Sequence, residues 1–267
     1  MAKRRKLGLA LGSGAIKGLF HLGVIKSLVK NNIPIDFIAG TSVGAIIGAH
    51  FALFQDLEKL EKFLLHDKLA KLWFLMDPNY GGGMIRGTKI KDYLRQVYAG
   101  KDFSQAKIPL RTVATDLISG KPIIFKQGKV YQGVYASMAV PGLFEPLKVK
   151  GQVLADGFIN NPVPDDVVKN MGADVVLAIN LDNYEDNQIL QKNGYKVSQI
   201  TWRTFEIMRH YLSQYSIKNA DLIIDPKGLN LYEGVSDYLL GISGLELVAM
   251  GEQETEKIIP QLKKLLK

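Results

Sequence analysis

The chain contains no cysteine among its 267 residues. This absence excludes a disulfide framework, a thiolate metal site and a cysteine nucleophile, and it is compatible with a reducing compartment. We therefore expect a cytoplasmic protein. Histidine is also scarce, with four residues, so few imidazoles are present that could act as a catalytic base.

The sequence also lacks a long uncharged run. No such run reaches the roughly 20 residues that a membrane-spanning helix needs. The basic residues 3–6 and the apolar residues after them resemble a secretory signal, but glycines and Lys17 interrupt that apolar stretch. We expect a protein that is soluble or peripheral at a membrane.

Acidic residues are outnumbered: 26 Asp and Glu stand against 34 Lys and Arg, which gives a net charge of +8. Hydrophobic residues make up 47% of the chain, a composition that excludes extensive disorder. The basic residues are scattered, and the densest run, 3–6, has no interleaved aromatic residue. We interpret them as a solvated face, with no nucleic-acid partner expected and a peripheral membrane contact as the alternative.

Short apolar runs alternate with stretches of helical spacing, which predicts a mostly parallel sheet with helices on both faces. No linker divides the chain, so we expect a single domain, 1–267. Strands are expected at 7–11, 36–39, 108–115, 121–125, 175–180 and 222–225, and helices at 19–29, 45–54, 57–72, 89–98, 164–171, 198–219 and 245–266. Loops are expected at 77–87 and 182–194.

The second predicted strand runs into a motif that is typical of a nucleophile elbow. The residues Gly40-Thr41-Ser42-Val43-Gly44 fit the pattern G-x-S-x-G, in which a serine on a sharp strand-to-helix turn projects its hydroxyl above a sheet. An apolar strand precedes the motif and a helix of small residues follows it. The sequence therefore predicts Ser42 as a nucleophile, and a serine that caps a buried helix is the alternative.

The first predicted strand ends in a glycine-rich loop, Gly12-Ser13-Gly14-Ala15-Ile16-Lys17-Gly18. Backbone N–H groups in such a loop can stabilise the oxyanion of an acyl-transfer reaction, and Lys17 adds positive potential. A dinucleotide site is the alternative, but the spacing is G-x-G-x-x-x-G and the second strand does not end in a carboxylate. We therefore interpret the loop as an oxyanion loop.

None of the four histidines is a convincing base for Ser42. His50 lies eight residues further along the same predicted helix, about 12 Å away along the axis. His66 and His210 lie in helical segments where packing or solvent contact is expected. His21 follows the glycine-rich loop, and we expect it to be a buried, hydrogen-bonded imidazole.

A carboxylate can replace histidine as the base if its burial raises its pKa or its geometry is favourable. Asp156 follows a short apolar stretch and precedes Gly157 in the only Asp-Gly pair of the chain. It is the candidate base. An ordinary type I′ or type II turn is the alternative interpretation of Asp-Gly.

These three segments, in this order, resemble the patatin-like phospholipases, particularly their compact bacterial members. The resemblance covers about 7–172 and includes 35–39 before the elbow and 136–142 before Asp156. It implies a three-layer α/β/α fold, completed by 173–267, and a Ser-Asp dyad without a catalytic histidine. By position, Ser42 is the nucleophile, Asp156 the base and the amides around Ser13, Gly14 and Ala15 the oxyanion hole. No metal or cofactor is implied.

Two features depart from the family pattern. Patatins typically have three glycines where this chain has Ser13-Gly14-Ala15, and Phe158 stands where a small residue is common. Neither difference removes a reacting group.

Two further segments bear on access to the site. Residues 72–76 are expected to form a mobile lid, an interfacial patch or part of a core helix. The spacing of Ile200, Met208, Tyr211 and Tyr215 predicts an amphipathic helix that docks on the sheet.

The expected function is hydrolysis of fatty-acyl ester bonds in lipids or phospholipids. A general carboxylesterase or lysophospholipase is one alternative, and a non-catalytic lipid-binding regulatory protein is another. The expected partner is a lipid or ester substrate, and the sequence makes no prediction of the oligomeric state.

Overall fold

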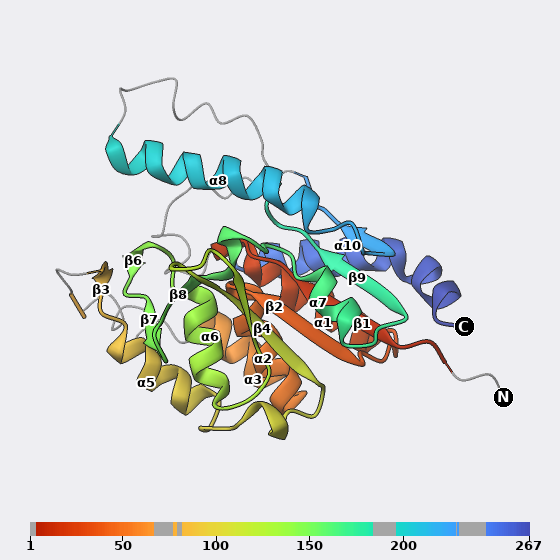
Figure 1. The fold of residues 1–267 in the computed structure, drawn as a ribbon. Coiled ribbons are helices and arrows are strands. Elements are labelled where there is room, and N and C mark those ends of the chain that lie inside the picture. The colour runs from red at the N-terminus through yellow and green to blue at the C-terminus, as the bar shows by residue number, and fades with distance from the viewer. Residues whose placement is uncertain (1–3, 67–76, 79–81, 184–195, 228, 230–243) are drawn as a thin grey trace.

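The computed structural model describes residues 4–66, 77–78, 82–183, 196–227, 229 and 244–267. Within this part of the chain, eight strands form one sheet in the order β10-β9-β1-β2-β4-β8-β7, with β5 also paired to β4 (Figure 1). The strands are β1 (Leu7–Leu11), β2 (Phe37–Thr41), β4 (Leu110–Asp116), β5 (Pro122–Phe125), β7 (Leu147–Val149), β8 (Gln152–Asp156), β9 (Val175–Ile179) and β10 (Leu222–Ile224).

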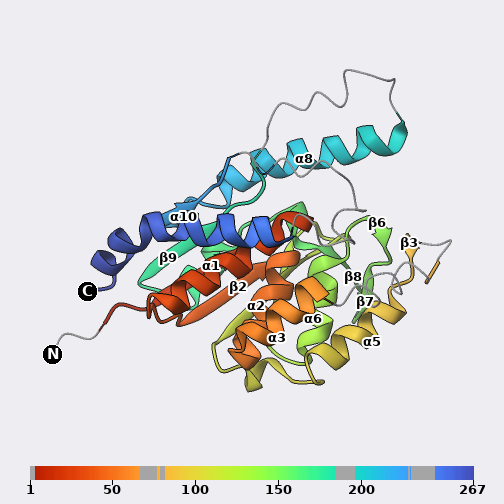
Figure 2. The same cartoon turned by 180° about the vertical axis from the view of Figure 1, so that it is seen from behind.

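The pairing is parallel from β10 to β4 and antiparallel where β5 and β8 join β4 and where β7 joins β8. Helices cover both faces of this sheet. One face carries α1 (Leu19–Lys30), α2 (Val43–Phe54), α3 (Leu57–Glu61), α5 (Thr88–Val97), α6 (Val130–Met138) and α10 (Gly244–Leu265), which Figure 2 shows in front of the strands. The other face carries α7 (Asp165–Asn170), and α8 (Val197–Tyr215) crosses one end of the molecule. The predicted three-layer α/β/α fold is confirmed.

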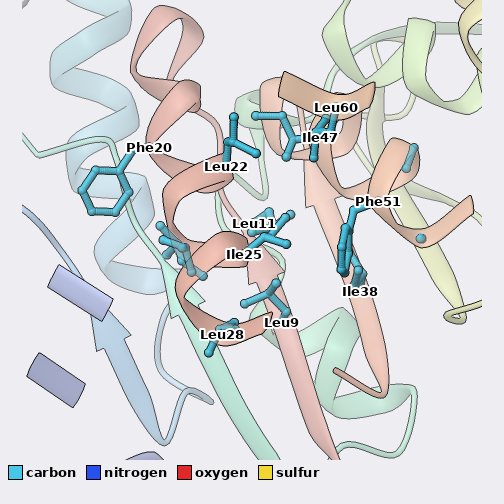
Figure 3. Packing of buried hydrophobic residues seen from close by; sticks show 14 of the residues in the cluster. Leu9, Leu11, Phe20, Leu22, Ile25, Leu28, Ile38, Ile47, Phe51 and Leu60 are labelled. Atoms are coloured by element: carbon cyan, nitrogen blue, oxygen red, sulfur yellow. The ribbon is translucent and has the colours of Figure 1, made fainter. Parts of the chain in front are cut away.

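Alternate residues of the central strands enter two separate cores. In β1, Leu7, Leu9 and Leu11 join the large cluster under α1 and α2, whereas Ala10 joins the cluster under α7 (Figure 3). All five residues of β1 are buried. A strand that is buried on both faces is typical of a parallel sheet covered by crossover helices.

The last helix, α10, lies directly on α1. A Cβ at Gly23 of α1 would lie 2.0 Å from the carbonyl oxygen of Val248, and a Cβ at Gly251 of α10 would lie 2.2 Å from that of Phe20. The two backbones therefore approach too closely for any side chain at these positions. This contact joins the C-terminal helix to the layer that contains the glycine-rich loop.

Several predicted elements differ from the structure. The helix expected at 57–72 consists of α3 followed by a π-helical turn, Lys62–His66, and its remainder lies outside the described residues. The expected loop 77–87 contains a short strand, β3 (Gly83–Ile85), which pairs with β6 (Gly142–Phe144). Helix α6 and strands β7 and β8 were not expected, because short elements rich in glycine and small residues have weak periodicity.

The segment 72–76, interpreted as a lid, a patch or a core helix, lies outside the described residues. So does most of the expected loop 182–194. Within the described residues, the helices are all too short or too polar to cross a bilayer.

Candidate active site

The three predicted motifs come together at one edge of the sheet. The glycine-rich loop follows the carboxyl end of β1, and Ser42 follows the carboxyl end of β2. Asp156 is the last residue of β8 and pairs with Ala114 of β4. Open α/β sheets bind their ligands at the carboxyl ends of the parallel strands, so the motifs occupy the edge where a substrate site is expected.

Ser42 lies on a strained turn between β2 and α2. Its φ of +56° and ψ of −122° place it in a region that L-residues rarely adopt. A Cβ at Gly40 would lie 2.4 Å from the carbonyl oxygen of Gly44, and a Cβ at Gly44 would lie 2.1 Å from that of Leu11. The two glycines are therefore required by the close passage of strand, turn and helix.

The hydroxyl of Ser42 donates a hydrogen bond to Asp156, with 2.6 Å between Oγ and Oδ2. The other carboxylate oxygen, Oδ1, accepts the N–H of Phe158 at 3.0 Å. Asp156 is fully buried and Ser42 is 8% exposed. Burial raises the pKa of Asp156 to about 7, although the hydrogen bonds from Ser42 and Phe158 act in the opposite direction. The pair thus has the geometry and the pKa of a nucleophile with its base.

Gly157 does not form the turn considered as the alternative for Asp-Gly. It opens a 3₁₀ helix, η4 (Gly157–Ile159), that Asp156 caps through the bond to Phe158, and its φ is not positive. A Cβ at Gly157 would lie 2.3 Å from the carbonyl oxygen of Val113 in β4. The glycine therefore allows the start of η4 to pass close to β4.

The glycine-rich loop lies against the elbow. A Cβ at Gly18 would clash with the side chain of Val43, the residue after Ser42. Within the described structure, the N–H of Gly14 has no hydrogen-bond acceptor, and Ala15 opens the 3₁₀ helix η1 (Ala15–Gly18), whose first N–H groups have no acceptor in the helix. The amide of Ser13 is already used, since it donates to the carbonyl oxygen of Pro162 at 2.8 Å.

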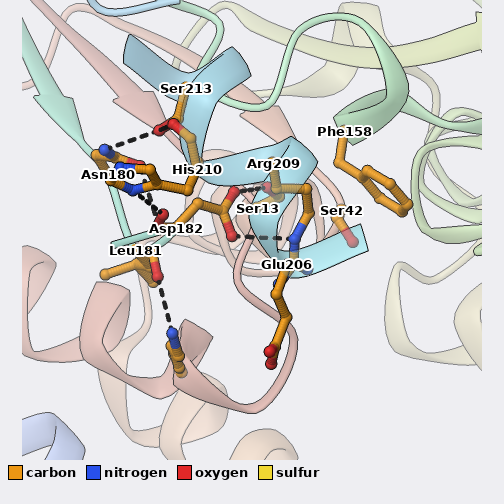
Figure 4. Close-up of polar contacts among 12 residues, drawn as sticks. Ser13, Ser42, Phe158, Asn180, Leu181, Asp182, Glu206, Arg209, His210 and Ser213 are labelled. Atoms are coloured by element: carbon orange, nitrogen blue, oxygen red, sulfur yellow. Dashed lines mark hydrogen bonds and ion pairs between the residues drawn. The ribbon is translucent and has the colours of Figure 1, made fainter. Parts of the chain in front are cut away.

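A buried polar network holds this loop from the side of α8 (Figure 4). The hydroxyl of Ser13 donates to Oδ2 of Asp182, whose side chain is completely buried. Nε of Arg209, on α8, lies 3.3 Å from Oδ1 of the same carboxylate. Lys17 donates from Nζ to the carbonyl oxygen of Leu181 at 3.3 Å. The loop is therefore fastened to the segment that follows β9.

Three of the four histidines are held by groups other than the Ser42-Asp156 pair. Nε2 of His21 bonds to the carbonyl oxygen of Gly12 at 2.8 Å, and complete burial lowers the pKa of His21 to about 4. His50 stacks on Phe63, and burial lowers its pKa to about 4 as well. His210 bonds through Nδ1 to the carbonyl oxygen of Asp182 at 3.1 Å. The side chain of His66 lies outside the described part of the structure.

An apolar pocket of about 460 Å³ lies between η4 and α8. Its lining includes Phe158 and, from α8, Phe205, Met208 and Tyr211. Phe158 is the residue whose N–H binds Asp156, and its ring centre lies 5.6 Å from the guanidinium carbon of Arg209 (Figure 4). The pocket and the contacts of Asp156 thus share one residue, Phe158.

Sequence reasoning missed three polar residues of this site. Ser137 accepts the N–H of Ser42 at 2.9 Å, and Asp182 and Arg209 form the network beside the loop. Asp182 and Arg209 belong to no local motif, because each acts on a residue that is distant in the sequence. Ser137 lies within the segment 136–142 that carries the family resemblance, but its contact with Ser42 was not expected.

Comparisons with known proteins agree with the family resemblance of the sequence. A family model described as patatin-like phospholipase matches residues 9–168. The uncharacterized NTE family protein Rv1063c of Mycobacterium tuberculosis is 35% identical over 183 residues, which cover 67% of this chain and 50% of that protein. Lysophospholipase nte1 of Aspergillus fumigatus is 32% identical over 193 residues, or 68% of this chain and 12% of that protein. The chain thus spans half the length of the mycobacterial relative.

Among solved structures, VipD from Legionella pneumophila resembles the fold with a TM-score of 0.54 and 15% identity, over 94% of this chain and 67% of that one. At this identity the likeness concerns the fold alone.

Proposed function

The chain belongs to the patatin-like phospholipase family, and we propose that it is a serine hydrolase that cleaves fatty-acyl ester bonds of lipids or phospholipids. The observation that carries this proposal is the 2.6 Å contact between the Ser42 hydroxyl and the buried Asp156 carboxylate. A mere helix-capping serine would not need a buried carboxylate, because burying an acidic group costs free energy.

In the proposed first half-reaction, Asp156 accepts the proton of Ser42 as Oγ attacks the ester carbonyl carbon. The N–H groups of Gly14 and Ala15 stabilise the resulting oxyanion. Collapse of this tetrahedral intermediate breaks the ester bond, and the leaving alcohol takes the proton from Asp156. The acyl group remains on Ser42.

In the second half-reaction, Asp156 accepts a proton from water, which attacks the acyl-enzyme. A second tetrahedral intermediate forms and collapses, the fatty acid leaves, and Ser42 recovers its proton from Asp156. A single carboxylate serves both steps because its pKa of about 7 lets it both accept and return a proton near neutral pH.

A lysophospholipase is the second candidate. A relative that is 32% identical is named a lysophospholipase, and the apolar pocket beside Phe158 suits an acyl chain. Turnover of lysophospholipids and two-chain phospholipids compared on one protein separates the two candidates. We also propose that the protein works in the cytoplasm and contacts a membrane surface peripherally.

The test is hydrolysis of p-nitrophenyl esters and phospholipids by the wild type, Ser42→Ala and Asp156→Asn. We expect each variant to lose at least about 1,000-fold in kcat. Ser27→Ala is the matched control, because Ser27 is a buried serine of α1 that bonds to Glu256, outside the site. Circular dichroism verifies that each protein is folded.

An Asp156→Asn variant with wild-type rates would overturn the proposed mechanism. A folded but inert wild type that still binds lipid would favour the non-catalytic lipid-binding alternative.

A further inference from the structure

Helix α8 presents its apolar residues to the outside of the molecule. Val197, Ile200, Met208, Tyr211 and Tyr215 recur at helical spacing and are between 48% and 81% exposed. The sequence pattern predicted that this stripe docks on the sheet, and this prediction is wrong. We call these five residues, together with the exposed Thr204 between them, the outer stripe.

The opposite side of α8 is polar and faces the protein. Its anchoring contacts are the Arg209 ion pair with Asp182, a 3.1 Å hydrogen bond from Asn180 to Ser213, and the bond between His210 and the backbone of Asp182. Charged and amide groups thus fasten the helix to the segment beside the glycine-rich loop. Because the polar residues of α8 bind partners in the protein, the apolar side of the helix faces outward.

The outer stripe has the chemistry of a surface that enters a lipid interface. The stripe runs along the 19 residues of α8, a length of about 28 Å, and none of its own residues is charged. The hydroxyls of Thr201 and Thr204 bond to the backbone carbonyl oxygens of Val197 and Ile200, at 2.9 Å each. No threonine hydroxyl on this side therefore needs water.

Cationic residues stand at both ends of the outer stripe. Lys196 precedes α8 and is exposed, and Lys218 follows it with Nζ 4.4 Å from the ring centre of Tyr215. The whole chain has a net charge of +8. A stripe with apolar and tyrosine side chains between lysines complements an anionic lipid surface, where tyrosine and lysine settle at the headgroup level.

The outer stripe also adjoins the apolar pocket. Met208, Tyr211 and Tyr215 belong both to the stripe and to the lining of this pocket, which also includes Phe158. Figures 1 and 2 show α8 crossing the end of the molecule at which β1 and β2 have their carboxyl ends. An acyl chain that leaves a lipid surface at the stripe would enter a pocket whose lining includes Phe158, the residue whose N–H binds Asp156.

We propose that the outer stripe of α8 is the surface by which this protein lies on anionic lipid membranes, and that it passes the acyl chain of the substrate into the adjoining pocket. This inference rests on the proposed function for the fate of the acyl chain. Binding to the membrane does not depend on hydrolysis, so the two can fail separately.

The experiment is flotation of the protein with vesicles of phosphatidylcholine, with and without phosphatidylglycerol. Ser42→Ala is the background, so that no lipid is hydrolysed. The test variant adds Val197→Ser and Ile200→Ser, which are stripe residues outside the pocket lining. The control adds Val29→Ser, because Val29 is 42% exposed near the far end of α1.

We expect the Ser42→Ala protein to bind anionic vesicles more tightly than neutral ones. The double serine change should weaken binding to anionic vesicles at least tenfold, and Val29→Ser should leave it unchanged. Equal flotation of the test variant and the control would overturn the proposal. Dimerisation through the outer stripe would also overturn it. In that case light scattering would show a dimer that the double serine change dissociates, while vesicle binding persists.

Hydrolysis of a soluble short-chain ester separates this inference from the proposed function. If the wild type floats with vesicles but turns over no ester, the membrane surface stands and the hydrolase fails. If the wild type turns over ester but never floats with vesicles, the hydrolase stands and the membrane surface fails.

Discussion

At the scale of single residues, Asp156 is the group whose surroundings matter most. Its two carboxylate oxygens are divided between the Ser42 hydroxyl and the Phe158 N–H. The positive charge of Arg209 lowers its pKa and the negative charge of Asp182 raises it, but burial has the largest effect and raises the pKa to about 7. The ionised form is the one that accepts a proton, so its population grows as the pH rises through 7.

This pKa predicts the pH dependence of hydrolysis. We expect kcat/KM for a soluble ester to rise about tenfold per pH unit below pH 7 and to level off above it, because only ionised Asp156 is a base. Initial rates between pH 5 and pH 9 measure this profile. A flat profile across that range would show that the base has an ordinary carboxylate pKa or is another group.

The raised pKa of Asp156 also predicts how the free energy of unfolding depends on pH: stability falls over the range in which activity rises. The folded protein holds the proton of Asp156 up to about pH 7, whereas an unfolded aspartate releases it near 3.8. The unfolded state therefore binds fewer protons between these values, and this carboxyl makes the protein less stable as the pH rises from about 4 to 7. Chemical denaturation of wild type and Asp156→Asn should show that the variant gains relative stability over this range. A constant difference between them would contradict the raised pKa.

At the scale of elements, the glycine-rich loop is positioned by a segment that lies far along the chain. Ser13 of the loop, Asp182 after β9 and Arg209 on α8 form one buried chain of contacts. Two of these three residues lie beyond the region 9–168 that the family model matches. The C-terminal part of the chain thus takes part in shaping the candidate oxyanion site.

This arrangement predicts the effect of Asp182→Asn. The amide cannot neutralise Arg209, so the loop loses its charged anchor, and we expect kcat for a soluble ester to fall about 10- to 100-fold with little change in KM. Removal of the Asp182 charge should also lower the pH midpoint of the rate, because that charge raises the pKa of Asp156.

Asp174→Asn is the matched control for Asp182→Asn. Asp174 precedes β9, whereas Asp182 follows β9. The carboxylate of Asp174 accepts the N–H of Lys6 at the other end of the strands. Equal losses in both variants, with an unmoved pH midpoint, would indicate general destabilisation instead of a role in positioning the loop.

At the scale of the whole molecule, the contact between α1 and α10 joins the end of the chain to its beginning. The backbones meet at Gly23 and Gly251, where no Cβ fits. Ion pairs flank the contact, with Lys26 lying 3.5 Å from Glu252. Such pairs are partly exposed and contribute little, so the close packing of the two backbones is the main attachment.

Gly251→Val should therefore destabilise the fold. The added side chain meets the backbone of Phe20 instead of a flexible group, and overpacking of this kind costs about 3 kcal/mol, or about 6 to 12 °C in Tm. Gln253→Val on the exposed side of α10 is the control, since it has the same β-branched side chain without the clash. Calorimetry of the two variants measures the difference. Equal melting temperatures would show that α10 can move away from α1 at no cost.

Much of the architecture could be predicted from sequence because it is encoded locally. Strands β1 and β2 are short apolar runs that lead into glycine-containing turns, and helices α1, α2, α5 and α10 agree with their expected positions to within two residues. Strand β8 was missed although it carries Asp156, since a run of five residues is too short to show a clear period. Helix α6 was missed because Gly133 interrupts its apolar pattern.

Three local motifs and the family resemblance that they carry were enough to name Ser42, Asp156 and the glycine-rich loop as candidates, because the residues of each motif are close together in the sequence. The contact between Ser42 and Asp156 joins residues 114 positions apart, and the role of Asp182 depends on β9 lying beside β1. Only the packed sheet decides such proximities. The orientation of α8 is likewise decided by the tertiary structure. A helical period determines which residues share a stripe, but the inner contacts of Arg209 and Ser213 decide which way that stripe faces.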